Sequence, residues 1–210
     1  MNYAGVDVGG MSIKCCLATE KGEILAKDSF KTEKDLTCAG MAEQTAACIK
    51  SLAAKAQVAE SEIVAVGMGI PGTVDGKKGM IVYCNNIRMD HAPIVKEMKK
   101  HFACPVYVEN DANAAAVGEA VFGAAKGLND VLLVTLGTGV GTGIIVNGRM
   151  ITGKGGTGAE GGHSMIRMNG EPCTCGNRGC YEAYASASAL LRQTERMVQR
   201  RPDSLLARLW

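Results

Sequence analysis

The sequence is short of proline, of aromatic residues and of charge of one sign. Its 210 residues include 5 prolines and 4% aromatics, and the formal net charge is +2 without a run of like charges. This charge balance argues against a nucleic-acid groove or an anionic membrane surface as partner. No apolar stretch is long enough to span a bilayer, and the start at Met1 lacks the basic segment of a signal peptide. These absences predict a cytoplasmic protein with neither nucleic-acid nor membrane partners.

What the sequence does contain is typical of a globular enzyme. Hydrophobic residues make up 47% and there are 27 glycines, which with so little proline indicates tight turns and not a linker. The nine cysteines are an odd number and mostly scattered, so a secreted disulfide framework is not expected. The length allows one large domain or two small ones.

Short apolar runs alternate with helical patterns, which predicts an α/β fold. Residues 131–136 are expected to be a buried strand, and the stretch after Pro71-Gly72 is expected to be irregular. Asn147-Gly148 is a strong hairpin turn signal, and a last helix is expected from Asp203-Ser204. The other predicted strands are 3–8, 12–19, 23–32, 63–70 and 106–109, and the predicted helices are 36–58, 93–102, 112–122 and 184–199.

Two glycine-rich turns join consecutive strands and are candidates for phosphate binding. One runs from Asp7 to Lys14 and the other from Gly137 to Gly143. Backbone N–H groups in such turns can converge on phosphate oxygens, and Asp7 could hold magnesium through water. The alternative is a pair of tight hairpins whose glycines need positive φ. Because strand, turn and strand occur twice, the sequence hints at two related halves.

Three cysteines lie close together in Cys173-Thr-Cys175-Gly-Asn-Arg-Gly-Cys180, and His163 lies a short loop upstream. Tetrahedral zinc needs four ligands, and this spacing is that of a metal knuckle with Cys₃His coordination. The alternative is a redox pair or a group of surface thiols.

An acid and amide cluster, Glu109-Asn110-Asp111-Ala112-Asn113, lies where a strand is expected to pass into a helix. The simple interpretation is that Asn110 or Asp111 caps the helix. A carboxylate at the carboxyl end of a strand is also where α/β sheets bind ligands, and the helix N-terminus would keep it ionised. Glu160 and Glu182 bracket the cysteine cluster and could join a polyhydroxyl-binding set.

Two motifs together resemble those of the ROK-family sugar kinases, most of all the bacterial glucokinase branch. They are Glu160-Gly161-Gly162-His163 and Cys173-x-Cys175-Gly176-x-x-Gly179-Cys180-x-Glu182, and the likeness extends over essentially the whole chain. The resemblance implies an actin-like (ribonuclease-H-like) ATPase fold with two α/β lobes, at residues 1–112 and 113–210, the second with a zinc knuckle. It also implies a homodimer or homo-oligomer.

The resemblance further implies transfer of the γ-phosphoryl group of ATP to the 6-hydroxyl of glucose, with magnesium and structural zinc. Asp111 would be the catalytic base, and zinc would be bound by His163, Cys173, Cys175 and Cys180. The sugar would be held by Gly69, Pro71, Gly72, Thr73, Asn86, Asn110, Asp111, Glu160, His163 and Glu182. The ATP phosphates would be held by Asp7, Gly9, Gly10, Met11, Ser12, Lys14, Gly137, Thr138, Gly139 and Gly141.

The chain also departs from the family pattern. Met11 stands where the family usually has Thr, and Thr142 where it usually has Gly. Family members continue well past Trp210, which predicts an incomplete second lobe, little ATP affinity and negligible kinase activity for these 210 residues. The alternatives are a kinase for an N-acetylhexosamine or fructose, a truncated and inactive sugar-binding or regulatory protein, and a zinc-stabilised fragment that only dimerises.

Overall fold

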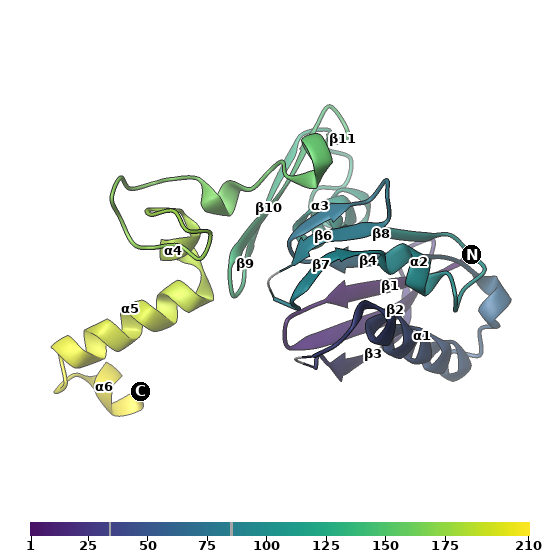
Figure 1. The fold of residues 1–210 in the computed structure, drawn as a ribbon, viewed down its shortest axis with the longest axis horizontal. Helices are drawn as coiled ribbons and strands as arrows, with labels where there is room; N and C mark the ends of the chain where they lie inside the picture. The colour runs from purple at the N-terminus through teal and green to yellow at the C-terminus, as the bar shows by residue number, and fades with distance from the viewer. Residues whose placement is uncertain (34, 85) are drawn as a thin grey trace. The chain divides into compact units, whose positions relative to one another are not determined.

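The chain folds into two compact units in the computed structural model, which describes residues 1–33, 35–84 and 86–210. Unit 1 comprises Met1–Leu132 and Gly143–Gly158, and unit 2 comprises Leu133–Thr142 and Ala159–Trp210. Figure 1 shows the course of the chain through both.

A five-stranded mixed sheet forms the centre of unit 1, with the strand order β3-β2-β1-β4-β8. β1, β2 and β3 pair antiparallel, whereas β4 is parallel to both β1 and β8. This confirms the predicted α/β class. The strands are β1 (Asn2–Val8), β2 (Ser12–Thr19), β3 (Ile24–Lys31), β4 (Ile63–Ile70) and β8 (Val106–Asn110).

Helix α1 (Cys38–Lys55) packs against β2 and β3, and Figure 1 shows it beside the sheet. The Thr37 side chain caps its N-terminus by accepting the Gly40 N–H. Its Met41, Ile49 and Leu52 side chains are fully buried, and each contributes about 1.5–3 kcal/mol to the free energy of folding. α1 is followed by a 3₁₀ turn, η1 (Glu60–Glu62), and the short helix α2 (Ile94–Met98) contacts both α1 and β8.

The stretch after Gly72, expected to be irregular, is a small sheet, so that prediction was wrong. Its strands β5 (Thr73–Asp75), β6 (Met80–Cys84) and β7 (Met89–Ala92) pair in the order β5-β6-β7. Strands of three to five residues are too short to show a clear alternation of apolar side chains. Gly72 and Gly79 have φ of +91° and +69°, so the backbone enters and turns this sheet where only glycine fits easily.

Helix α3 (Asp111–Phe122) begins directly at the end of β8, packs against β4 and β8, and ends at Gly123 as expected. It therefore lies wholly in unit 1, whose first segment continues to Leu132.

β9 (Val131–Leu136), β10 (Val140–Val146) and β11 (Arg149–Met150) form a three-stranded sheet in the order β11-β10-β9, with the Asn147-Gly148 turn as predicted. The prediction that β9 is buried was wrong, because Leu132, Val134 and Leu136 are 66%, 42% and 64% exposed. These three side chains are every second residue of the strand, so they share one face of it. That face is open to solvent. A 3₁₀ turn, η2 (Lys154–Gly156), follows.

Unit 2 ends in helices, with the 3₁₀ turn η3 (Gly161–His163) before them. The single helix expected over residues 184–199 is two helices, α4 (Glu182–Ala185) and α5 (Ala187–Arg200), separated at Ser186. Ser186 adopts an extended backbone, and its side chain accepts the Ala189 N–H, which caps α5. Ser204 caps the last helix, α6 (Leu205–Leu209), as the sequence predicts. Within the described ranges, no helix is both long and apolar enough to cross a membrane.

Candidate functional site

The carboxyl ends of the three parallel strands, β1, β4 and β8, bring together predicted site residues in unit 1. Asp7 of β1 is paired with Gly69 of β4, and Gly69 is paired with Glu109 of β8. Asn110 and Asp111 follow Glu109 directly. This edge of a parallel sheet is where α/β folds bind ligands.

Asn110 is a helix cap, which confirms the simpler of the two interpretations of its cluster. Its Oδ1 accepts the N–H groups of Ala112 and Asn113 at 3.0 and 3.1 Å. Its Nδ2 donates to the Gly72 carbonyl at 3.0 Å, which ties α3 to the loop after β4. The same side chain therefore fixes both Asp111 and the predicted sugar-binding loop.

The Asp111 carboxylate accepts the Ala112 N–H at 2.9 Å. Partial burial raises the pKa of Asp111 above its ordinary value and the charge of Asp7 raises it further, although the Ala112 N–H acts in the opposite direction. The Ala112 N–H at the helix N-terminus therefore favours the ionised form, as expected, but burial outweighs it. A carboxylate with a raised pKa is a stronger proton acceptor than an ordinary one.

Glu109 and Asn113 complete this junction, although no separate role was predicted for either of them. Glu109 Oε1 accepts the Asn113 Nδ2 at 3.1 Å and the Asn110 N–H at 2.8 Å. Asn113 is buried, and within the described residues its Oδ1 has no hydrogen-bond partner. The signal in the sequence was the density of amide and acid side chains, which is typical of such a network.

The first glycine turn is held by the backbone of unit 1. Gly9 N–H donates to Ser12 O at 3.0 Å, and Thr32 Oγ1 donates to Gly9 O at 2.7 Å. Neither Gly9 nor Gly10 has positive φ, so that explanation of these glycines was wrong. Gly9 is needed for space instead, since a Cβ there would lie 2.8 Å from Ser12 O.

The side chains around this turn are mostly open to solvent. Lys14 Nζ pairs with Asp7 Oδ2 at 2.9 Å, and Met11 is 84% exposed. A Cβ on Gly10 would lie 3.5 Å from the Asn86 Cβ, so Asn86 neighbours the turn. A mixed set of a carboxylate, a lysine and glycine backbone suits a metal-bound phosphate.

The predicted sugar-binding loop Gly69–Thr73 needs glycine at Gly72. Its φ is +91°, and a Cβ there would collide with the Tyr83 carbonyl. A Cβ on Gly69 would lie 3.5 Å from the Asp111 Cα, so the loop begins beside the proposed base.

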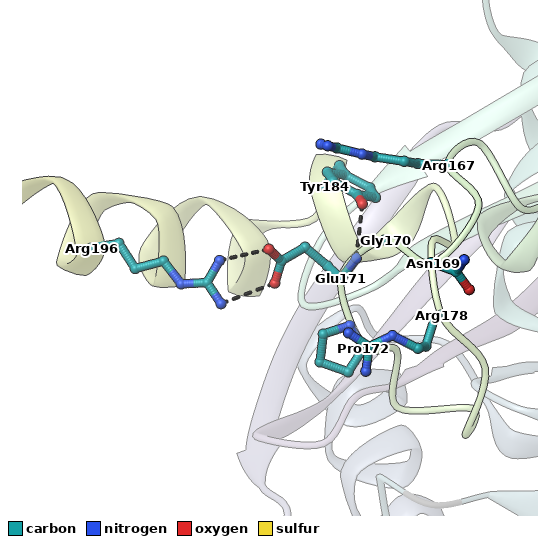
Figure 2. A pocket seen from close by; sticks show the side chains of 8 residues that line it. All are labelled: Arg167, Asn169, Gly170, Glu171, Pro172, Arg178, Tyr184 and Arg196. Atoms are coloured by element: carbon teal, nitrogen blue, oxygen red, sulfur yellow. Dashed lines mark hydrogen bonds and ion pairs between the residues drawn. The ribbon is translucent and has the colours of Figure 1, made fainter.

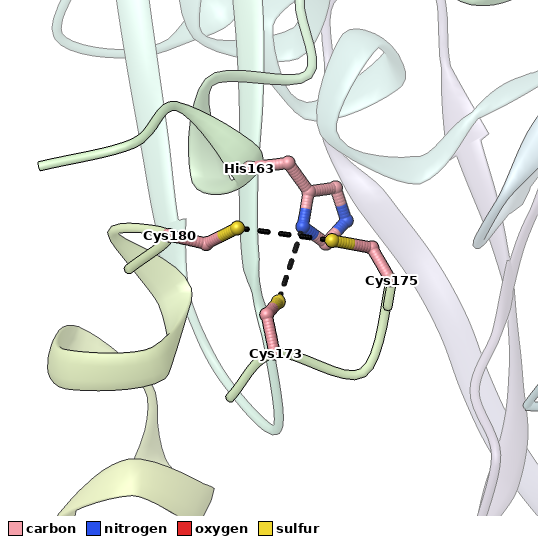
Figure 3. Close-up of side chains that lie close together, drawn as sticks. All are labelled: His163, Cys173, Cys175 and Cys180. Atoms are coloured by element: carbon pink, nitrogen blue, oxygen red, sulfur yellow. Dashed lines mark hydrogen bonds between the residues drawn. The ribbon is translucent and has the colours of Figure 1, made fainter. Parts of the chain in front are cut away.

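His163, Cys173, Cys175 and Cys180 form one cluster in unit 2, as the sequence predicts (Figure 3). Their ligand atoms all lie within 4.8 Å of one another. Cys173 Sγ lies 3.6 Å from His163 Nδ1, and Cys175 Sγ lies 3.7 Å from Cys180 Sγ. A tetrahedral zinc with bonds of about 2.0–2.3 Å has ligand–ligand edges of about 3.5–3.8 Å, so the four side chains fit zinc.

The backbone of the cysteine loop depends on Gly176 and Gly179, whose φ values are +89° and +78°. A Cβ on Gly179 would collide with the Arg167 carbonyl. Burial raises the pKa of the Cys180 thiol to about 12, whereas the Asn177 backbone N–H lowers that of Cys175. Metal ligation needs thiolates, so binding at this cluster releases protons.

The second glycine turn, in unit 2, is held from outside by α4 and α5. Glu182 Oε2 accepts the Val140 N–H at 2.9 Å. The Ala187 N–H and the Ser188 Oγ donate to Gly137 O and Thr138 O, both at 2.8 Å. Positive φ is absent from the glycines of this turn as well, within the described residues. Glu182, predicted to hold sugar, thus contacts the predicted phosphate turn.

Thr142, a departure from the family pattern, anchors the segment that carries Glu160. Its hydroxyl donates to the Ala159 carbonyl and accepts the Gly161 N–H at 2.8 Å. The side chain that replaces the usual glycine therefore fixes the start of the Glu160–His163 motif.

A polar pocket of about 330 Å³ lies beside the metal loop in unit 2 (Figure 2). Glu171 makes two bonds to Arg196 of α5, at 2.7 and 3.0 Å, and these lower its pKa. Tyr184 Oη accepts the Glu171 N–H at 2.8 Å. No local sequence pattern predicts this ion pair, which joins Glu171 to α5. The lining residues are Arg167, Asn169, Gly170, Glu171, Pro172, Arg178, Tyr184 and Arg196.

The predicted site residues thus fall into one group in each unit. Unit 1 holds the first phosphate turn and Gly69, Pro71, Gly72, Asn86, Asn110 and Asp111. Unit 2 holds the second turn with Gly137, Thr138, Gly139 and Gly141, the metal cluster, and Glu160 and Glu182.

Comparison with known proteins finds the ROK family over residues 3–208. The glucokinase of Halalkalibacterium halodurans is 37% identical over 206 residues, which cover 98% of this chain and 62% of that protein. The xylose repressor of Bacillus spizizenii is 41% identical over 133 residues, which cover 63% of this chain and 34% of the repressor.

A solved structure, the ROK family glucokinase of Streptomyces griseus in complex with glucose and AMPPNP, matches the fold with a TM-score of 0.83 at 36% identity. The match covers 97% of this chain and 63% of the solved chain. This chain therefore spans less than two thirds of the length of both glucokinases.

Proposed function

The chain belongs to the ROK family, and on this premise we propose that the whole protein is an ATP-dependent hexose kinase that phosphorylates glucose on its 6-hydroxyl. The observation that carries the proposal is the Asp111 carboxyl group, which has a raised pKa at the carboxyl end of the sheet. Asp7, Asn110 and the loop from Gly69 meet it there. This is the arrangement that general-base catalysis at a ligand-binding edge requires.

Asp111 accepts the proton of the sugar 6-hydroxyl in the proposed reaction. The hydroxyl oxygen forms a bond to the γ-phosphorus, the bond between the γ-phosphorus and the bridging oxygen breaks, and ADP leaves. Such a transfer asks the protein mainly for positioning and for stabilisation of negative charge. Asn110 contributes the positioning, because it fixes both α3 and the loop at Gly72.

Phosphate binding is proposed for the two glycine turns. In unit 1 the phosphate-binding groups are the backbone of Gly9 and Gly10 together with Met11, Ser12 and Lys14. Asp7 would hold magnesium through water. In unit 2 they are Gly137, Thr138, Gly139 and Gly141. When bound, ATP supplies the phosphoryl group and magnesium neutralises part of its charge.

Sugar binding is proposed for Gly69, Pro71, Gly72, Asn86, Asn110 and Asp111 of unit 1 and for Glu160, His163 and Glu182 of unit 2. The cluster of His163, Cys173, Cys175 and Cys180 would hold structural zinc. The ligand distances near 3.6–3.7 Å support this, since all four positions are filled by protein and none is left for a reacting water.

The experiment that tests the proposal is glucose-dependent ADP release by the whole protein and its Asp111→Asn variant. Loss of the base should lower turnover by about 10²–10⁴-fold while glucose affinity stays nearly unchanged. Asp90→Asn is the matched control, because the exposed Asp90 side chain bonds only to His91 among the described residues. An Asp111→Asn variant that keeps most of its turnover would overturn the assignment.

A second candidate is a regulator that binds sugar without turnover. It is favoured by the likeness to a xylose repressor and by the exposed Met11 in the first phosphate turn. Glucose or xylose binding without ADP release would support it, whereas ADP release with either sugar excludes it. The same assay with fructose and an N-acetylhexosamine separates glucose kinases from kinases of other hexoses.

A further inference from the structure

One side chain in unit 2 touches both the metal loop and the second glycine turn. Glu182 Oε2 accepts the Val140 N–H at 2.9 Å, while Glu182 Oε1 accepts the Thr174 hydroxyl at 3.2 Å. We infer that Glu182 is a positioning residue that couples metal binding at the cysteine cluster to the order of the Gly137–Val140 turn. The inference rests on the proposed zinc site, and its value for catalysis rests on the proposed function.

The contact with the metal loop is direct. Thr174 lies between two of the proposed ligands, and Glu182 follows the third, Cys180, by two residues. Cys173 Sγ also donates to Glu182 Oε1, at 3.8 Å. The thiol proton leaves when Cys173 binds a metal, so the Thr174 bond is the one that remains. A metal that fixes the cysteine loop thereby fixes the position of the Glu182 carboxylate.

The contact with the turn is equally close. A Cβ on Gly139 would collide with Glu182 Oε2, so the carboxylate is seated against the turn. Ala187 and Ser188 hold the other side of the turn through the Gly137 and Thr138 carbonyls. The short segment from Cys180 to Ser188 therefore connects the metal cluster to both sides of the turn.

These bonds define which groups the turn can offer to an anion. Gly137 N–H donates within the turn to Gly139 O at 2.9 Å, and Val140 N–H is held by Glu182. The bonds that hold the turn, among the described residues, leave the Thr138 and Gly139 N–H groups for a phosphate. Fixing the backbone of one residue costs about 1–2 kcal/mol, so a turn ordered beforehand binds an anion more tightly.

Amide hydrogen exchange of these 210 residues tests the coupling without ATP or sugar. Exchange of the Val140 amide is compared between the zinc-loaded and the chelator-treated chain, with β4 (Ile63–Ile70) in unit 1 as the folding reference. Zinc removal should speed Val140 exchange by about 10-fold, within the usual range of coupling between sites, and leave β4 unchanged. Unchanged Val140 exchange after removal of the metal would overturn the inference.

Two variants separate Glu182 from the metal itself. In the zinc-loaded state, Glu182→Ala should speed Val140 exchange by about 10-fold, and Glu182→Gln, which keeps one acceptor oxygen, should have a smaller effect. Because Glu182 carries the coupling, zinc removal should speed Val140 exchange less in Glu182→Ala than in the wild type. Glu171→Ala is the matched control, since Glu171 is also a carboxylate of the metal loop but pairs with Arg196 instead.

Either of two results with the variants would contradict the inference. One is Val140 exchange in zinc-loaded Glu182→Ala equal to that of the wild type. The other is an equal change in Glu171→Ala, which would mean that any carboxylate of this loop has the effect. Neither result bears on whether the whole protein phosphorylates glucose, so the two proposals fail separately.

Discussion

The two glycine turns look alike in sequence but are held in different ways. The turn at Gly9 and Gly10 is fixed by the backbone of its own strands and by Thr32, which follows β3 in the same sheet. The turn from Gly137 to Val140 is fixed by Glu182, Ala187 and Ser188, which follow the metal cluster in the chain. The first is therefore part of the sheet in unit 1, whereas the second depends on a loop that a metal can order.

Loss of a metal ligand should produce the largest difference between the units. Substitutions next to a metal ligand typically weaken metal binding by about 10–100-fold. Cys175→Ser removes a ligand, so it should weaken zinc binding by more than this and loosen unit 2. The five-stranded sheet of unit 1 should keep its hydrogen-exchange protection. Zinc content by elemental analysis, together with exchange in both units, provides the measurement.

Scattered cysteines offer the control for that substitution. Cys104→Ser changes a half-buried thiol of unit 1 that lies far along the chain from the cluster, and it should leave zinc content unchanged. Wild-type protein without zinc after careful purification would contradict the proposed metal site.

Replacing glycine by alanine should destabilise the two turns by different amounts, and this difference should be smaller than the one caused by loss of a metal ligand. Gly9→Ala should destabilise by about 1–3 kcal/mol, because its Cβ would lie 2.8 Å from Ser12 O. Gly137→Ala has nothing within 4 Å of the new Cβ and should change stability by less than about 0.5 kcal/mol. Denaturant unfolding of both variants gives the comparison, and equal losses would show that the turns are held alike.

The smallest effect is expected from the charge of Asp111. Its folded pKa is raised, so between 3.8 and that value the native state binds more protons than the unfolded state. Stability therefore falls as the pH rises through this window. At pH 7 Asp111→Asn should be more stable than the wild type by less than about 1 kcal/mol, since solvent screens the carboxylate.

The sign of that effect can be checked by unfolding over a range of pH. The gain in stability should shrink as the pH falls and disappear below the ordinary value of 3.8. A gain that is the same at all pH values would mean that the amide stabilises through packing and not through loss of charge.

Local patterns in the sequence predicted the main elements because those elements are long and buried. β4 was predicted at its observed bounds, and α1 and α3 within a few residues, since continuous apolar runs and Ala-rich periodicity are strong signals. The strands β5 to β7 were missed because they are too short for periodicity. The break at Ser186 was missed because a serine in an Ala-rich stretch is as compatible with a helix interior as with a helix cap.

The candidate site was predictable as far as it lies in local motifs. Spacing alone grouped the four metal ligands, and the cluster around Asp111 marked its junction. The bond from Glu182 to Val140 joins residues 42 apart, so no local pattern contains it. The same holds for the pairing of Glu171 with Arg196, and for the partial burial that raises the pKa of Asp111.

Glucose binding to these 210 residues, followed by calorimetry before and after zinc removal, tests the account most directly. We predict that the zinc-loaded chain binds glucose at one site per chain and that zinc removal abolishes binding. The position of Asp111 depends only on unit 1, whereas the positions of His163 and Glu182 depend on the metal loop. Zinc-loaded chain that binds no glucose, or glucose binding that survives complete zinc removal, would contradict it.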